Sequence, residues 1–389
     1  MIKFLSKVNP KKLKGVAIVA LDFNTEDEWR MKATLPTVKF LVKNKVKILI
    51  LSHLGRPSAI KIKKGKPKGR DLKLTLKNKA VNLGKFLGRK VGFIPYFKFK
   101  EIKQLLNESK PGSVFVLENL RFLKGEYDNN PKLASQIASL GDFYVNDAFS
   151  NSHRDDVSVD AITRFLPSYG GFQLEKEVDH LSRVMMKAKR PLVVVLGGGK
   201  AEDKLGILEF FRNKADHFLL GGATANTMFW LQGLDIGDSV ADREHKNKFK
   251  KYLKYKNVIS PSDCNLKGRK ILDVGPRTIK NYSEIIKKAK TIIWNGPLGL
   301  IEEKPYDRGT LAMAKAIAEN RSAFSLAGGG ETVMFLKKYG LDKKFSFIST
   351  GVGAMLEFLA GKKLPGISAL ENSRAEIRST KSEIRNKFK

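Results

Sequence analysis

The sequence predicts an α/β protein with two doubly wound parallel-sheet domains, which are joined by a connecting helix and separated by a cleft. Three observations predict this fold class. Short apolar runs recur along the chain, as in strands buried on both faces of a parallel sheet. Segments with apolar residues at helical spacing lie between these runs. The runs end in charged side chains in the first half and in glycine turns in the second, which favours two Rossmann-like domains.

Buried strands in the first half of the chain are each followed by polar or basic residues. The strand runs are Val16–Leu21, Val46–Leu51, Ser113–Leu117 and Phe143–Val145. The residues that follow them are, in order, Asp22 and Asn24, His53 and Arg56, Arg121, and His153 and Arg154, with Arg30 before the helix that comes after the first strand.

Basic residues after several parallel strands predict an anion site. The carboxyl ends of parallel strands meet along one edge of a sheet, where open α/β folds bind their ligands. Arginine suits bidentate recognition of carboxylate and phosphate groups. A single arginine at a strand end would most often be a surface residue, but several together indicate a site for a small polyanion.

An amphipathic segment, Gly171–Met186, is expected to be the helix that connects the domains. We therefore predict an N-terminal domain over residues 1–170, this helix over 171–186 and a C-terminal domain over 187–364. The segment 365–389 is expected to pack back on the N-terminal domain.

The second half opens with the strand Leu192–Leu196, and Gly197–Gly199 follow it directly. Glycines let a backbone approach a ligand closely and expose its N–H groups. A helix is expected to start at Ala201–Glu202, with Lys200 and Lys204 on one face of its first turn. Two cations beside a helix N-terminus favour phosphate binding. The alternative is a glycine turn with solvated lysines, and the Walker pattern is absent.

Other glycine turns follow the expected strands His217–Leu220, Thr291–Trp294, Ala323–Leu326 and Phe347–Ser349. Any one of them could be a simple connection between a strand and a helix, but together they favour a nucleotide site held by backbone amides. The carboxylate of Glu331 is suited to holding Mg²⁺ beside phosphates. The candidate residues in these turns are Gly198, Gly221, Gly222, Asn295, Pro297, Gly328, Gly329, Gly330, Glu331 and Thr332.

The charge of the chain is strongly positive. Lysine and arginine number 73 against 39 aspartate and glutamate, a formal net charge of +34, which attracts anions of every kind. The lysines are scattered, so we expect nucleic acid to bind only weakly and without specificity. The basic clusters Lys61–Arg70 and Arg374–Lys389 are interpreted as a mobile loop and a tail. One cysteine and no membrane-length apolar run favour a protein of the reducing cytoplasm.

The motifs at these turns resemble those of the phosphoglycerate kinase family, in the same order and from about Val16 to Leu370. They are DFN (22–24), SHLGRP (52–57), ENLRF (118–122), VNDAF (145–149), LGGGKAEDKLG (196–206), DVGP (273–276), WNGPLG (294–299), GGGET (328–332) and a segment that begins STGVGAM at Ser349. The resemblance implies reversible, Mg²⁺-dependent transfer of a phosphoryl group from 1,3-bisphosphoglycerate to ADP, which yields 3-phosphoglycerate and ATP. It also implies a monomer, and in-line transfer after closure of the two domains.

The resemblance also implies a role for each matching residue. Arg30, Lys204, Gly351 and Gly353 would act on the transferring group. Lys200 would contact the nucleotide phosphates, and Glu302 the ribose, beside the glycine-turn residues already named. The glycerate and its phosphate would be held by Asp22, Asn24, Arg30, His53, Arg56, Arg121, His153 and Arg154.

The chain departs from the family pattern at several positions. Glu331 replaces the usual aspartate, and Val352 adds a side chain within the usual TGGG motif. The loop Thr25–Trp29 is shortened, and Asp156 stands where a second histidine is common. Rival hypotheses are an unrelated small-molecule kinase and a catalytically weakened protein that binds nucleic acid.

Overall fold

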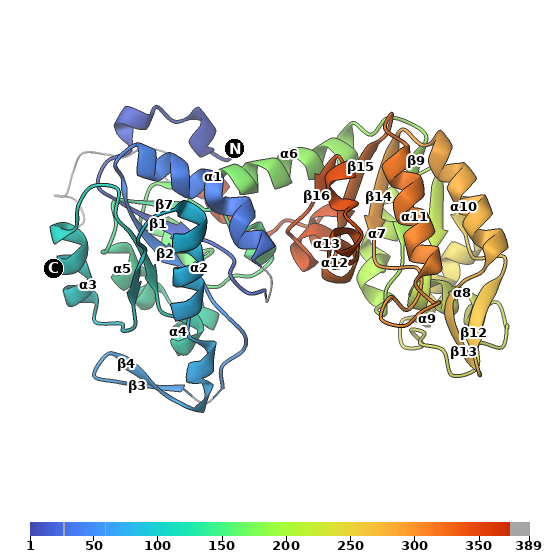
Figure 1. The fold of residues 1–389 in the computed structure, drawn as a ribbon, viewed down its shortest axis with the longest axis horizontal. Helices are drawn as coiled ribbons and strands as arrows, with labels where there is room; N and C mark the ends of the chain where they lie inside the picture. The colour runs from blue at the N-terminus through green and yellow to red at the C-terminus, as the bar shows by residue number, and fades with distance from the viewer. Residues whose placement is uncertain (26–27, 59, 374–389) are drawn as a thin grey trace. The chain divides into compact units, whose positions relative to one another are not determined.

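The computed structural model describes residues 1–25, 28–58 and 60–373 of the chain (Figure 1). The chain divides into two units, of which unit 2 is Glu177–Lys362. Unit 1 combines Met1–Lys176 with the segment that begins at Lys363. Each unit has a six-stranded sheet with parallel pairing throughout, so the predicted fold class is confirmed. Within the described ranges, no helix has both the length and the apolar character needed to cross a membrane.

The sheet of unit 1 has the strand order β5-β6-β2-β1-β7-β8. Its central strand β1 is buried along its whole length, as its run of apolar residues predicts. The expected strands of the first half are confirmed as β1, β2, β6 and β7. The strand bounds are β1 Val16–Ala20, β2 Lys47–Leu51, β5 Gly92–Ile94, β6 Val114–Leu117, β7 Phe143–Asn146 and β8 Ser168–Gly170.

Helices cover the sheet of unit 1, and a hydrophobic core forms beneath them from residues such as Ile18, Val38 and Ile50, all fully buried. The α-helices are α1 Trp29–Lys43, α2 Lys77–Leu87, α3 Phe99–Glu108, α4 Lys124–Tyr127, α5 Pro131–Ala138 and α14 Pro365–Asn372. The 3₁₀ helices are η1 Leu5–Lys7, η2 Pro10–Lys12, η3 Arg70–Leu74, η4 Leu120–Phe122, η5 Phe149–Asn151 and η6 Ala161–Arg164.

The basic cluster Lys61–Arg70 is not the loop that its composition indicates. It forms an antiparallel hairpin of β3 (Ile60–Lys63) and β4 (Lys66–Gly69), separate from the six-stranded sheet (Figure 1). The interpretation as a loop is wrong because a two-residue turn with glycine at its second position pairs the two lysine-rich strands. The second basic cluster, Arg374–Lys389, lies outside the described residues.

The sheet of unit 2 has the order β11-β10-β9-β14-β15-β16. Its first strand in the chain, β9, lies at the centre beside β14. In a sheet of this order, connections leave in opposite directions from these two strands, and the ligand crevice opens at their carboxyl ends. The strand bounds are β9 Leu192–Leu196, β10 His217–Leu220, β11 Val258–Ile259, β14 Thr291–Asn295, β15 Phe324–Gly328 and β16 Phe347–Ile348, with a separate hairpin of β12 Cys264–Lys267 and β13 Lys270–Val274.

Unit 2 has a second hydrophobic core, which includes Trp294 on β14 with no exposed surface. The α-helices around it are α7 Leu205–Phe211, α8 Gly222–Leu231, α9 Lys246–Lys250, α10 Pro276–Lys288, α11 Arg308–Glu319, α12 Gly330–Lys338 and α13 Gly353–Leu359. The 3₁₀ helices are η7 Glu202–Lys204, η8 Lys251–Lys254 and η9 Asp342–Lys344.

A single helix, α6 (Phe172–Met186), runs from one unit into the other, since the division falls between Lys176 and Glu177. The start of α14 is attached to unit 1 through a hydrogen bond from the backbone N of Gly366 to the carbonyl O of Ser152, at 2.9 Å.

A buried carboxyl group makes the stability of unit 1 depend on pH. Glu126 on α4 is 1% exposed and accepts hydrogen bonds from the hydroxyl and the backbone N of Ser158. Burial raises the pKa of Glu126 from 4.5 to about 7, although the bonds from Ser158 oppose the shift. The folded state therefore keeps a proton that the unfolded state releases between these two values.

Glu126→Gln is expected to weaken the pH dependence of stability. The wild type should lose stability as pH rises from 4.5 to 7 because only its folded state is protonated there, at about 1.4 kcal/mol per pH unit. Thermal denaturation followed by circular dichroism at several pH values measures the difference between the two proteins. Glu101→Gln, at an exposed position, is the control, and parallel pH profiles for wild type and Glu126→Gln would contradict the assignment.

Candidate functional site

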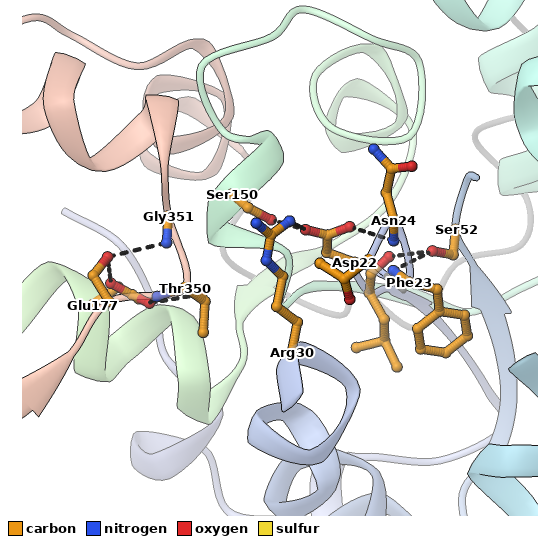
Figure 2. Close-up of polar contacts among 12 residues, drawn as sticks. Asp22, Phe23, Asn24, Arg30, Ser52, Ser150, Glu177, Thr350 and Gly351 are labelled. Atoms are coloured by element: carbon orange, nitrogen blue, oxygen red, sulfur yellow. Dashed lines mark hydrogen bonds and ion pairs between the residues drawn. The ribbon is translucent and has the colours of Figure 1, made fainter. Parts of the chain in front are cut away.

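A buried carboxylate, that of Asp22, organises the site in unit 1 (Figure 2). Asp22 lies two residues beyond the end of β1, and its Oδ2 accepts a hydrogen bond at 2.6 Å from Nη1 of Arg30 in the first turn of α1. The hydroxyl of Ser150 also donates to Oδ2, and the backbone N of Asn24 donates to Oδ1 at 2.8 Å. Burial by itself would raise the pKa of Asp22, but Arg30, His53 and these hydrogen bonds lower it below its usual value.

Gly55 ties together the loops that follow β1, β2 and β6. Its backbone N donates to Oδ1 of Asn24 at 2.8 Å, and its carbonyl O accepts from Nη1 of Arg121 at 2.6 Å. Asn119, which precedes Arg121, donates to the carbonyl O of Leu54 at 2.8 Å. Three strand ends that the sequence places far apart are therefore joined at one sheet edge, as parallel pairing predicts.

Buried nitrogen atoms in this cluster lack hydrogen-bond partners within the described residues. They are Nε of Arg30, Nε2 of His53, Nε and Nη2 of Arg121, and Nε of Arg154. A buried donor without a partner costs about 1–3 kcal/mol, more when it is charged. The cluster therefore has donors and positive charge that suit an anionic ligand.

The pKa of His53 reflects the same excess of positive charge. Burial lowers the pKa of His53 from 6.5 to about 3, and the neighbouring Arg121, Arg154 and Arg30 add to the shift, while Asp22 opposes it. The imidazole is thus neutral at pH 7. Burial also lowers the pKa of the Arg121 guanidinium. A bound anion would relieve this repulsion between cations.

The other residues predicted for the anion site of unit 1 differ in their exposure to solvent. Arg56 is exposed, and His153 and Arg154 are half-buried. Asp156 is buried, and burial raises its pKa while Arg154 and Arg121 lower it, so this departure from the family pattern offsets part of the local positive charge. The shortened loop Thr25–Trp29 includes residues 26 and 27, which lie outside the described residues.

Binding of an anion is expected to raise the pKa of His53 from about 3, because a negative charge nearby favours the imidazolium form. An NMR titration of the histidine ring signals, with and without saturating sulfate, measures the shift, and His53→Gln assigns the signal. His245 in unit 2 is the reference. An unchanged midpoint for His53, with sulfate binding confirmed by calorimetry, would show that the anion binds elsewhere.

Glycines in unit 2 allow the loops after β9, β10 and β14 to pack backbone against backbone. A Cβ at Gly197 would lie 2.1 Å from the carbonyl O of Pro297, and one at Gly222 would lie 2.7 Å from that of Gly198. The backbone N atoms of Gly197 and Gly198 donate to the carbonyl O atoms of Asn295 and Pro297, at 3.0 and 2.7 Å. The expectation that these two N–H groups are free for a ligand is wrong, since neighbouring loops use them.

The two lysines of this loop have different environments. Lys204 is 6% exposed, and burial lowers its pKa while Asp203, Glu331 and Glu202 oppose the shift. Lys200 is exposed and precedes the helical segment, which begins as the 3₁₀ helix η7 before α7. The expectation of both lysines on one face of a helical turn is therefore wrong, and the buried cation is Lys204.

A cavity of about 370 Å³ opens beside these loops in unit 2. Gly198, Gly222, Pro297, Glu302 and Glu331 line it among the predicted residues. Its apolar wall includes Phe229, Val240, Leu272 and Leu300. A cavity of this size, with apolar walls and a smaller number of polar groups, suits a small organic ligand.

Other residues predicted to bind the nucleotide hold the loops together. Nδ2 of Asn295 donates to the carbonyl O of Gly328 at 3.1 Å, and Oγ1 of Thr332 accepts from the backbone N of Gly296 at 3.0 Å. Both side chains are buried. Gly329 has φ of 97°, a conformation that favours glycine, directly before α12.

Gly197→Ala is expected to disrupt the loop packing, because its Cβ would meet the backbone of Pro297 at 2.1 Å. We expect a loss of at least about 2 kcal/mol of stability, as for other overpacked backbone positions, together with weaker binding of ligands in the cavity. Thermal denaturation and calorimetric titration with ADP measure the two effects. Gly199→Ala is the matched control, since no heavy atom of the described residues, apart from Gly199 and its chain neighbours, lies within 4 Å of its added Cβ. An equal loss in both variants would contradict this reading.

Glu177 is a positioning residue that sequence reasoning missed (Figure 2). Its carboxylate is fully buried and accepts hydrogen bonds from the hydroxyl of Ser349 at 2.8 Å, and from the backbone N and hydroxyl of Thr350, both at 2.6 Å. The sequence gives one sign of this role, which is that an acidic residue, Glu177, lies within the segment expected to form the connecting helix. Its partners lie 172 and 173 residues away, so local pattern could not reveal them.

The loop that Glu177 holds continues into a strained residue. Val352 has φ of 41° and ψ of −107° at the residue before α13. This conformation is rare for a β-branched residue and costs about 1–3 kcal/mol. The predicted residues Gly351 and Gly353 flank it directly.

Glu331 is the predicted metal ligand. The structure describes no group of three or more His, Cys, Asp or Glu side chains arranged to hold a metal ion within residues 1–25, 28–58 and 60–373. One carboxylate at the edge of the cavity still fits Mg²⁺, which usually binds through one or two carboxylates together with substrate phosphates.

Comparisons with known proteins show which family this chain resembles along most of its length. The model of the family described as phosphoglycerate kinase matches residues 18–362. The chain is 38% identical to the phosphoglycerate kinase of Pseudothermotoga lettingae over 391 residues, covering 92% of this chain and 96% of that one. It is also 38% identical to that of Zymomonas mobilis over 372 residues, covering 89% and 91%.

Solved structures of phosphoglycerate kinases are similar in fold to this chain. Phosphoglycerate kinase from Coxiella burnetii matches with a TM-score of 0.79 and 31% identity, over 95% of this chain and 99% of that one. The enzyme from Pyrococcus horikoshii matches with a TM-score of 0.82 and 29% identity, over 95% and 98%.

Proposed function

The chain belongs to the phosphoglycerate kinase family, a family of glycolytic phosphotransferases, and we propose on this basis how its residues transfer a phosphoryl group between 1,3-bisphosphoglycerate and ADP. Unit 1 is proposed as the domain that binds the triose, and unit 2 as the domain that binds the nucleotide. The observation that carries the proposal is the cluster of buried donors in unit 1, at Arg30, His53, Arg121 and Arg154, that lack hydrogen-bond partners within the described residues.

The triose would bind through this cluster. The guanidinium groups of Arg121 and Arg154, with Arg56 and His153 at more exposed positions, would hold the phosphate and carboxylate groups. Neutral His53 would donate a hydrogen bond, which requires no proton uptake at pH 7. Asp22 would orient Arg30 through their 2.6 Å ion pair, and Asn24 would complete the site.

The nucleotide would bind in the cavity of unit 2. Its base would lie by Gly221 and Gly222, and its ribose near Glu302, which lines the cavity. Lys200 would contact the phosphates from the solvent side. Asn295, Thr332 and the glycines 328–330 would act by holding the loops in place, as their hydrogen bonds support.

The transfer itself needs cations and amide groups and no covalent enzyme intermediate. An oxygen of the terminal phosphate of ADP attacks the acyl phosphorus, and the carboxylate of 3-phosphoglycerate leaves. Arg30 and the buried Lys204 would balance charge on the transferring group, and the backbone at Gly351 and Gly353 would donate to it. Because the two substrates must meet, we propose that the domains close during the reaction.

Mg²⁺ is proposed to bind beside Glu331 together with the nucleotide phosphates, where it would neutralise part of their charge. The longer side chain of glutamate retains the carboxylate of the usual aspartate. We further propose that the protein is a monomer of the cytoplasm.

A coupled assay with 3-phosphoglycerate and MgATP tests the assignment, since it follows the formation of ADP. Arg30→Ala and Lys204→Ala are each expected to lower kcat about 10²- to 10³-fold, because each removes a donor to charge that develops during transfer. Lys248→Ala, at an exposed position on α9, is the control and should retain full activity. Wild-type activity in the folded Lys204→Ala variant would refute its assigned role.

A further inference from the structure

The β3–β4 hairpin of unit 1 carries its lysines in a regular array. The strands pair antiparallel, with Lys61 opposite Lys68 and Lys63 opposite Lys66. The connection is the two-residue turn Lys64-Gly65, with φ of 50° and 77°, and positive φ at both positions matches the twist of a tight hairpin. Figure 1 shows the hairpin as a separate ribbon below the sheet of unit 1.

All four paired lysines lie on one face of this ribbon. Residues opposite each other in a ladder share a face, and so do residues two apart on a strand. The other face carries the small and apolar residues Ile60, Ile62, Pro67 and Gly69. The four lysines are exposed, and neighbours along each strand are about 7 Å apart.

This arrangement is electrostatically unfavourable without a partner. Like charges directly opposite each other destabilise a strand pair. In the part of the chain that the structure describes, none of these four lysines forms an ion pair or a hydrogen bond to an acidic side chain. The nearby carboxylate of Glu101 is bound to Lys98 instead.

The hairpin is held in place at its turn. The carbonyl O of Gly65 accepts a hydrogen bond from the backbone N of Phe97 at 2.6 Å. A Cβ at Gly65 would lie 2.4 Å from Cγ of Lys98, so the turn packs closely against the start of α3. The lysines are therefore carried by a backbone whose turn is held in place, so little backbone conformational entropy would be lost on binding.

We propose that this lysine face, defined as Lys61, Lys63, Lys66 and Lys68, binds the phosphate backbone of double-stranded DNA without sequence preference. The major groove admits a two-stranded ribbon, and lysines bind phosphates as point charges. Residues 60–69 contain no aromatic side chain on which single-stranded bases could stack. The lysine face also has no apolar anchor of the kind that inserts into a membrane surface.

The test compares two variants that lose the same charge. One replaces the four lysines of the face with glutamine. The matched control replaces four exposed lysines scattered over the helices α5, α9, α10 and α11 with glutamine, namely Lys132, Lys246, Lys288 and Lys315. Fluorescence anisotropy with a labelled 30-base-pair DNA duplex measures Kd over a range of salt concentrations. Kinase activity reports that both variants are folded.

The face variant should raise Kd at least about tenfold and reduce the slope of log Kd against log salt by about 3 to 4, since each lysine on a phosphate contributes about 0.9. The control should change both quantities much less. Equal weakening in the two variants would show that the general positive charge binds DNA, and would overturn the proposal. Binding of the wild type to anionic phosphatidylserine vesicles but not to the duplex would overturn it as well.

Discussion

Parallel pairing of strands is the constraint on which both candidate sites depend. In each unit it brings the carboxyl ends of strands that are distant in the sequence to one edge of a sheet. At this edge the loops are linked by specific hydrogen bonds, through Gly55 and Asp22 in unit 1 and through Gly197 and Gly198 in unit 2. Loops tied in this way hold side chains in position before a ligand arrives, which lowers the entropy that binding must overcome.

The two candidate sites differ in the charges that they bury. Unit 1 gathers several cations around the buried carboxylate of Asp22, and burial together with these cations lowers the pKa of His53 to about 3. Such a site is stabilised by an anionic ligand. Unit 2 buries one cation, Lys204, within electrostatic reach of several carboxylates, and the rest of its cavity is largely apolar. The first arrangement suits a small molecule with charge at both ends, and the second a nucleotide with a flat base.

A buried carboxylate on α6, that of Glu177, fixes the backbone of the loop before α13. Glu177 holds Ser349 and Thr350 by three hydrogen bonds, and the same loop contains Val352 in a conformation that is rare for valine. Strain of this kind persists only where surrounding contacts determine the backbone. The hydrogen bonds that Glu177 accepts are contacts of this kind, and they link the helix α6 to the loop before α13.

The amino-acid sequence by itself determined the central strands of both sheets, their parallel arrangement and the residues at their ends, because apolar runs and helical spacing are local patterns. It did not predict the short edge strands β5, β8 and β11. The tertiary structure alone decided which polar groups are buried and which are hydrogen-bonded to other segments. It showed that the amides of Gly197 and Gly198 bind neighbouring loops, that Lys204 is buried while Lys200 is exposed, and that Lys61–Arg70 includes a paired hairpin. It also found the partners of Glu177, 172 and 173 residues away. Burial and hydrogen-bond partners depend on contacts between distant segments, and no local period encodes them.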